Sequence, residues 1–204
     1  MDKAIDVAVA EVTSMLAAKY PSLTFSHQKR MMLTDIVAGL AVEFPQYQPI
    51  FGDTRETSFI TPDGGFLYAT DAAGKTKIIL IAEVKRQGTN NKRALEGKPK
   101  QAQGNAIERL GKNLIGIRAI FKNDPVLPFV CFGQGEDFKA GSSILDRIVT
   151  MNEFFPLNKT YVQKAYGPFE PVSMYFRKND WSGDEMVQIM FDIANQAVNE
   201  IFDL

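Results

Sequence analysis

The hydrophobic pattern along the chain predicts helices toward both ends and strands between them. Apolar residues recur at helical spacing over 4–19 and 26–43. Continuous or alternating apolar runs predict strands at 59–61, 66–70, 77–85, 126–132 and 172–176. Helical spacing returns at 104–121, 142–155 and 182–202. Residues 88–103 are polar and are predicted as a long exposed loop, a kind of segment that is often functional.

This order of elements predicts an α/β fold in which helices flank a mixed central β-sheet. We expect a single domain over 1–204. It would comprise N-terminal helices (1–45), a central sheet with one helix (59–132), and C-terminal helices with a strand (142–204).

Composition excludes several classes of protein. No apolar run approaches the roughly 20 residues of a membrane span, and the N-terminus lacks the pattern of a signal peptide. The single cysteine, Cys131, excludes an internal disulfide. The single histidine, His27, argues against a histidine metal site or a catalytic triad.

Charge is distributed unevenly, although the whole chain carries a net charge of only −1. The segment 85–118 holds nine Lys and Arg residues but only Glu96 and Glu108 as acids. Such a segment can contact phosphates and steer DNA toward the protein. An ordinary solvated loop and helix face would have the same composition, so charge alone does not decide between the two.

Candidate chemistry appears where the apolar strand 77–85 ends. Glu83 and Lys85 share one face of that strand, and buried charges are costly unless they are paired or bind an ion. Asp63 lies in a Pro-Asp-Gly-Gly turn before the preceding strand. Two carboxylates and a backbone carbonyl suit Mg²⁺, and a lysine beside them can stabilise charge on a phosphate. An ion pair at a strand end is the alternative interpretation.

The helix predicted over 104–121 has a compact polar stripe. Its apolar face consists of Ile107, Leu110, Leu114, Ile117 and Phe121. Its polar face consists of Asn105, Glu108, Arg109 and Lys112. Asparagine and arginine can hydrogen-bond purine edges in the DNA major groove, although such a stripe alone is more often a solvated surface.

Together these segments resemble the EcoRI-type restriction endonucleases, within the PD-(D/E)xK nuclease superfamily, over nearly the whole chain. The residues that carry the resemblance are Tyr20-Pro21-x-Leu23-x-Phe25, Pro62-Asp63-Gly64-Gly65, Ala82-Glu83-x-Lys85, Gly104–Arg109 with Lys112-Asn113, Ile144-Leu145-x-Arg147, and Ile189-Met190-Phe191-Asp192-Ile193. The block Gly104–Arg109 is far more specific than the three nuclease residues.

The resemblance implies a restriction-endonuclease-like core and Mg²⁺-dependent cleavage of double-stranded DNA by a homodimer. The catalytic residues would be Asp63, Glu83 and Lys85, with Mg²⁺ held by Asp63, Glu83 and the Val84 carbonyl. The residues matching or flanking the family's DNA-binding positions are Arg86, Gln87, Gln101, Gln103, Gly104, Asn105, Ala106, Glu108, Arg109, Lys112 and Arg147. The implied site is palindromic with an inner AATT, cut by a metal-activated water to leave 5′-phosphate ends.

The resemblance also implies a cytoplasmic protein of a bacterial or archaeal cell, in which a cognate methyltransferase protects the host DNA. Segments 86–103 and 133–143 are shorter than in the family pattern, which predicts less complete wrapping of DNA. A structure-selective or repair nuclease, and a DNA-binding protein without catalysis, remain the alternative functions.

Overall fold

A five-stranded mixed sheet forms the centre of the protein. The computed structural model describes residues 3–88, 90–99 and 105–204, with the side chains of all of these except 3, 90–92 and 105. The strands, in spatial order, are β1 (Thr24–Gln28), β4 (Gly65–Thr70), β5 (Thr76–Arg86), β6 (Phe129–Gln134) and β7 (Ser173–Arg177). Pairing is antiparallel from β1 through β4 to β5 and parallel from β5 through β6 to β7, which confirms the predicted mixed sheet.

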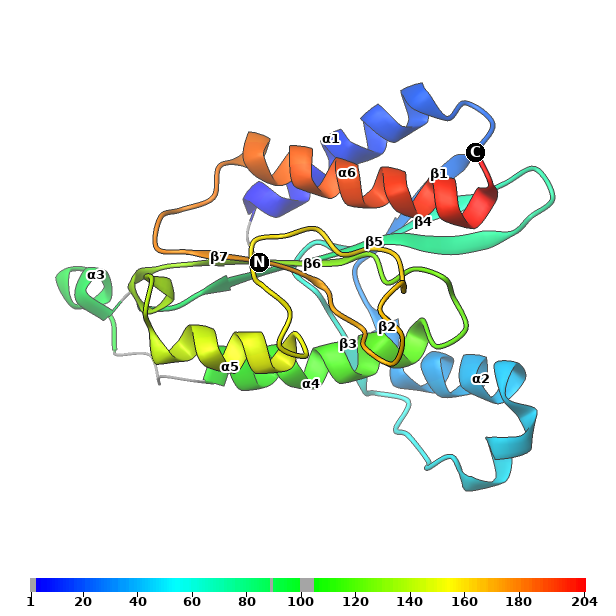
Figure 1. Ribbon diagram of the computed structural model, residues 1–204, viewed down its shortest axis with the longest axis horizontal. Helices are drawn as coiled ribbons and strands as arrows, with labels where there is room; N and C mark the ends of the chain where they lie inside the picture. The colour runs from blue at the N-terminus through cyan, green and yellow to red at the C-terminus, as the bar shows by residue number, and fades with distance from the viewer. Residues whose placement is uncertain (1–2, 89, 100–104) are drawn as a thin grey trace.

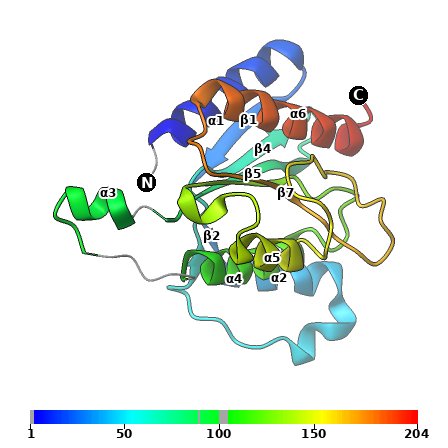
Figure 2. The ribbon, with the colours of Figure 1, turned by 60° about the vertical axis from the view of Figure 1, so that its left-hand side comes forward.

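Helices cover both faces of this sheet (Figures 1 and 2). On one face lie α1 (Lys3–Lys19) and α6 (Gly183–Phe202); on the other lie α4 (Asn105–Ile120), α5 (Ser143–Met151) and α2 (Leu33–Glu43). The remaining elements are α3 (Asn90–Leu95), the 3₁₀ helices η1 (Pro45–Ile50) and η2 (Glu136–Phe138), and a two-stranded sheet of β2 (Met31–Met32) and β3 (Phe59–Ile60). None of the described helices is both long and apolar enough to cross a membrane.

Strand β5 is buried because it lies between β4 and β6 and contributes side chains to both faces. Leu80 and Val84 pack in an apolar cluster with α1 and α6, whereas Ile78 and Ile81 pack in a second cluster with α4 and α5. This burial on two faces explains why β5 reads as a continuous apolar run. The same sheet buries Cys131 completely, as a free thiol.

The structure corrects several predicted boundaries. Residues 26–43 are not one helix: β1 and β2 occupy its first part, and α2 begins only at Leu33. The predicted loop 88–103 contains the short helix α3. The helix expected over 142–155 ends at Met151, because Glu153 and Phe154 adopt left-handed backbone conformations that a right-handed helix does not contain. The strand expected at 126–132 begins only at Phe129 and continues to Gln134.

The long C-terminal helix begins with a capping box. The Ser182 hydroxyl accepts a hydrogen bond from the Glu185 N–H at 3.2 Å, and the Glu185 carboxylate accepts one from the Ser182 N–H at 3.0 Å. Arg177 on β7 also donates to both carboxylate oxygens of Glu185. Hydrogen bonds from Arg177 and Ser182 lower the pKa of Glu185 to about 2.

We therefore expect Glu185→Gln to reduce stability at neutral pH but not in acid. Because the folded-state pKa of Glu185 is depressed, its contribution is present above the unfolded-state pKa and disappears as pH falls from about 5 toward 2. Urea denaturation at several pH values measures this difference from the unsubstituted protein. Glu11→Gln, at an exposed position on α1, is the control, and a difference independent of pH would contradict the assignment.

Candidate active site

The three candidate catalytic residues converge at the end of β5, as their spacing predicts. The Asp63 N–H donates to Glu83 Oε2 at 2.8 Å, and the Val84 N–H donates to Asp63 Oδ2 at 3.2 Å. The Lys85 ammonium contacts Glu83 Oε1 directly and lies 3.8 Å from Asp63 Oδ2. Two carboxylates and one ammonium thus share a small volume, and hydrogen bonds from the backbone fix the position of both carboxylates.

Burial and mutual attraction shift the pKa values of Glu83 and Lys85. Glu83 is only 3% exposed, so desolvation raises the pKa of its carboxyl against the opposing attraction of Lys85. Burial acts to lower the pKa of Lys85, but the acidic groups around it, Glu83 foremost, together outweigh burial, and the net direction is upward. The lysine therefore stays protonated, whereas the carboxylate is costly to ionise in the absence of further positive charge.

The side chains present suit a hard divalent cation. Asp63 and Glu83 offer carboxylate oxygens, and Val84, between Glu83 and Lys85, offers a backbone carbonyl. Across the described ranges, no group of three or more His, Cys, Asp or Glu side chains is arranged to hold a metal. An ion at this position would need water or substrate oxygens to complete its coordination, which is the usual situation for Mg²⁺.

One contact to the Asp63 turn was not predicted. His27 Nε2 lies 2.7 Å from the carbonyl oxygen of Gly64, the residue that follows Asp63. The sequence interpretation missed this histidine because it placed residue 27 in a helix, whereas β1 pairs with β4 and carries His27 to the turn. Nothing local in the sequence marks this pairing, because the side chains of β1 are mostly exposed and show no clear alternation.

Helix α4 has the two faces that its sequence predicts. Ile107, Leu110, Leu114 and Ile117 are buried against the sheet. Glu108, Arg109 and Lys112 are exposed. Arg118, at the other end of the helix, is directed inward and donates to the carbonyls of Met151 and Glu170, so it belongs to the fold rather than to the exposed basic surface.

The other candidate DNA-binding residues are placed less uniformly. Arg86 at the end of β5 and Arg147 on α5 are exposed, and Ala106 is half-buried. Gln87 is 4% exposed, and neither polar atom of its side chain has a partner in the part of the chain that the structure describes. Gln101, Gln103 and Gly104 lie outside the described residues, as does the side chain of Asn105.

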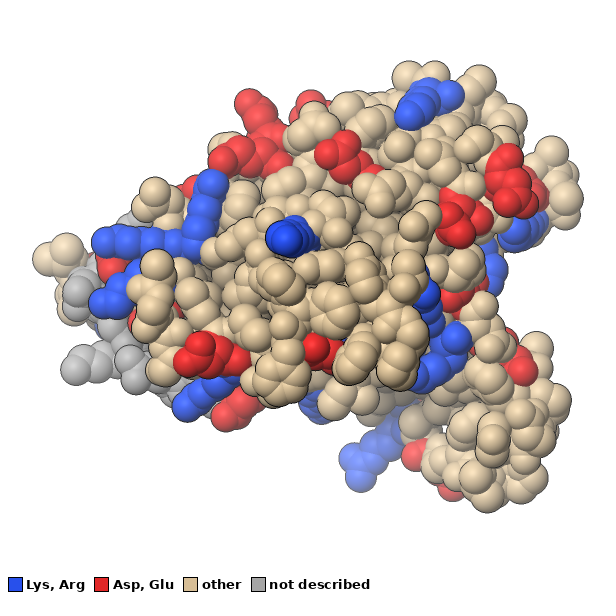
Figure 3. Space-filling view, viewed as in Figure 1, with Lys and Arg blue, Asp and Glu red and all other residues tan. Residues whose placement is uncertain are grey.

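The elements that carry the catalytic and recognition candidates lie toward the same end of the molecule. In Figure 1 the end of β5, helix α3 and the start of α4 are all on the left. Figure 3 shows Lys and Arg side chains at this end and also on the opposite side of the molecule, and it shows Asp and Glu side chains along the upper edge over α1 and α6 and at several other places. On this face the charges are therefore mixed and do not form a single basic patch.

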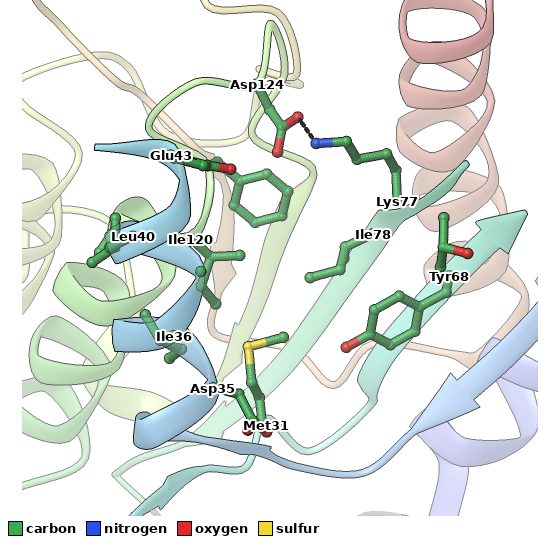
Figure 4. Close-up of a pocket in the computed structure, with 14 residues that line it drawn as sticks. Met31, Asp35, Ile36, Leu40, Glu43, Tyr68, Lys77, Ile78, Ile120 and Asp124 are labelled. Carbon is green, nitrogen blue, oxygen red and sulfur yellow. Dashed lines mark hydrogen bonds and ion pairs between the residues drawn. The ribbon is translucent and has the colours of Figure 1, made fainter. Parts of the chain in front are cut away.

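A largely apolar pocket lies elsewhere in the described part of the chain. Figure 4 shows a cavity of about 240 Å³ between α2, the first residues of β5 and the end of α4. Its walls are largely apolar, and Lys77 is paired with Asp124 at 2.6 Å while Asp35 and Glu43 lie at its rim. Lys77 precedes Glu83 by six residues, roughly 20 Å along the strand. An apolar pocket with acidic residues at its rim does not suit DNA, so we do not assign it to the catalytic cluster.

The chain resembles known proteins over nearly its whole length. The family model for "Restriction endonuclease EcoRI" matches residues 1–144. The chain is 27% identical to the type II restriction enzyme RsrI of Cereibacter sphaeroides, over 97% of this chain and 85% of that protein. It is 28% identical to the type II restriction enzyme EcoRI of Escherichia coli, over 96% of this chain and 85% of that protein. Because the family model matches well over half of its residues, including the Asp63 turn, the end of β5 and the whole of α4, the chain belongs to the EcoRI restriction endonuclease family.

Proposed function

We propose that this protein is a type II restriction endonuclease whose catalytic residues are Asp63, Glu83 and Lys85. It acts as a homodimer, requires Mg²⁺ and cuts both strands of a palindromic DNA site with an inner AATT, leaving 5′-phosphate ends. The single observation that carries the proposal is the convergence of these three residues at the end of β5. Membership of the family supports the same activity. A bacterial or archaeal cytoplasm, with a separate methyltransferase protecting host DNA, is the setting that this activity requires.

The donor set supports Mg²⁺ as the cofactor. Asp63, Glu83 and the Val84 carbonyl would hold the ion, and the scissile phosphate and water would complete its shell. A bound Mg²⁺ would polarise the phosphate and favour ionisation of the attacking water. The raised pKa of the Glu83 carboxyl is consistent with this assignment, because a buried carboxylate beside a single ammonium gains stability from additional positive charge.

The chain's own residues orient the reacting groups. Lys85 Nζ, held by Glu83, can donate a hydrogen bond to the attacking water or to a phosphoryl oxygen that gains negative charge. Glu83 fixes Asp63 by accepting its N–H, and Asp63 in turn accepts the Val84 N–H. This network holds the groups in place before DNA arrives, which reduces the entropic cost of aligning them in the transition state.

We assign recognition of the DNA sequence to the exposed stripe of α4. Glu108 and Arg109 lie in its first turns, from which side chains can reach base edges in the major groove. Arg86, Lys112 and Arg147 are proposed contacts to DNA. Gln87 is a further candidate, because its buried amide has no partner among the described residues. A palindrome offers each subunit of a twofold dimer the same half-site, which supports the homodimer.

Digestion of DNA of known sequence tests the proposed activity. We expect discrete fragments with 5′-phosphate ends when Mg²⁺ is added and no cleavage in EDTA, because the carboxylates alone supply no electrophile. Mapping the ends determines the site and the cut position. A continuous smear would instead identify a structure-selective nuclease, and binding without cleavage at any Mg²⁺ concentration would identify a catalytically silent DNA-binding protein.

The Lys85→Ala variant tests the catalytic cluster. We expect its single-turnover cleavage rate to fall by about 10²–10³-fold, while its affinity for DNA largely survives, because the lysine stabilises charge that develops in the reaction. Glu83→Ala should behave in the same way. Rates are measured at saturating DNA, with binding followed by gel shift and folding by thermal unfolding.

Lys77→Ala is the matched control for Lys85, because it removes an ion-paired lysine from the same strand, far from the cluster. It should cleave at the unsubstituted rate. Equal cleavage by the Lys85 and Lys77 variants would refute the catalytic assignment.

The Arg109→Ala variant tests base reading by α4. Losing a base-edge contact should weaken specific binding by about 1–3 kcal/mol and relax the choice of site. By contrast, Lys112→Ala removes a charge suited to phosphate and should weaken binding to all sequences similarly, with a shallower salt dependence. Competition binding against DNAs with single base-pair changes separates the two effects. Unchanged selectivity in Arg109→Ala would exclude its recognition role.

A further inference from the structure

Hydrogen bonds to neighbouring strands hold the turn that presents Asp63. The Gly65 N–H donates to the Pro62 carbonyl at 3.0 Å and closes the turn. The Gly64 N–H donates to the Ala82 carbonyl at 2.9 Å and attaches the turn to β5. Two consecutive glycines give this segment more backbone freedom than other residues would, so its conformation depends on these external contacts.

His27 completes the set from the opposite side. Its Nε2 lies 2.7 Å from the Gly64 carbonyl oxygen. A carbonyl oxygen only accepts hydrogen bonds, so Nε2 must carry a proton, and this selects the Nε2–H tautomer whenever the ring is neutral. The His27 ring thus binds the one polar group of the Gly64–Gly65 peptide that the turn itself leaves unpaired.

The close approach of this ring requires the glycine at position 65. A Cβ atom on Gly65 would lie 2.6 Å from His27 Nε2 and 2.5 Å from the Gln28 carbonyl oxygen. The φ angle of Gly65 is also +71°, a conformation that other residues rarely adopt. Two independent features of the backbone, the pairing of β1 with β4 and the absence of a side chain at 65, therefore bring the imidazole to the turn.

We propose that His27 is a positioning residue for the nuclease reaction: through the Gly64 carbonyl it fixes the turn that presents Asp63 to the metal and the phosphate. This inference rests on the proposed function. The Asp63 side chain is 32% exposed, and of the hydrogen bonds described to it only that from the Val84 N–H comes from the backbone, so its position follows the position of its turn. His27 itself is exposed at the protein surface beside α1 and packs in neither apolar cluster. Its loss should therefore affect the turn more than the global fold.

Three variants of the full chain test whether His27 positions the Asp63 turn or only stabilises the fold. His27→Leu removes the donor, whereas His27→Gln keeps an N–H donor on a side chain of similar reach. Thr24→Val, three residues earlier on β1, is the control for changes to the strand. We expect His27→Leu to lower the single-turnover cleavage rate at saturating DNA by about 10-fold and to raise the Mg²⁺ concentration for half-maximal rate several-fold, since small misplacements of reacting groups reduce rates this much. DNA affinity and the thermal unfolding midpoint should stay unchanged, and His27→Gln should recover most of the rate.

Two measurements without metal or DNA test the contact itself. The protein has one histidine, so its imidazole gives a single set of ¹⁵N–¹H correlations, which should report the Nε2–H tautomer at alkaline pH. Amide exchange at Gly64 and Gly65 should accelerate in His27→Leu and return toward the original rate in His27→Gln. An Nδ1–H tautomer, or unchanged exchange in His27→Leu, would overturn the contact.

The activity measurements then decide the role. Cleavage by His27→Leu at the original rate and Mg²⁺ dependence would overturn the positioning role, and so would equal losses in the Leu and Gln variants accompanied by a lower unfolding midpoint. If the unsubstituted protein cleaved no DNA at all, the proposed function would fail instead, and the tautomer and exchange results would still stand as measurements of the His27 contact.

Discussion

The ion pair of Glu83 and Lys85 is the constraint around which the rest of the site is arranged. Placing a carboxylate and an ammonium at the end of a strand enclosed by β4 and β6 carries a desolvation cost of several kcal/mol per ion, which their attraction offsets only when the geometry is good. Parallel pairing with β6 puts Cys131, a small and fully buried side chain, opposite Glu83 and so leaves room on the face where the charges lie. The N–H of Asp63 then satisfies the second oxygen of Glu83.

The proposed catalytic cluster and the proposed DNA-reading stripe of α4 are joined through the apolar core rather than through the charges. The face of β5 that carries Glu83 and Lys85 also carries Ile81, which belongs to the same apolar cluster as Leu110 and Leu114 of α4. Packing of α4 on this face therefore determines how far its exposed stripe lies from the catalytic cluster. A rigid core between a cutting site and a reading surface is what cleavage at a defined sequence requires, since protein interiors transmit small displacements rather than absorb them.

Local sequence patterns predicted those elements whose packing follows a simple period. The continuous apolar run of β5 and the 3.6-residue period of α4 each have a single good explanation, a strand buried on two faces and a half-buried helix. The prediction of one helix over 26–43 was wrong because the apolar spacing from Met31 onward is typical of a helix. The preceding TFSHQ is an edge strand whose side chains are mostly exposed and lack a clear alternation. Edge strands gain their stability from backbone pairing, which leaves little trace in side-chain pattern.

The chemical groups of the candidate site can be identified from the sequence: two carboxylates, one lysine, a Pro-Asp-Gly-Gly turn and a helix with one polar stripe. These follow from residue identity and short-range spacing, and a β-strand necessarily places residues 83 and 85 on one face. Which distant groups come into contact depends instead on how the strands pair in the folded chain. The approach of Asp63 to Glu83 depends on the register of β4 against β5, and that of His27 to Gly64 depends on the pairing of β1 with β4. The first contact joins residues that are 20 positions apart, and the second joins residues that are 37 positions apart. Strand register, not local preference, brings them together.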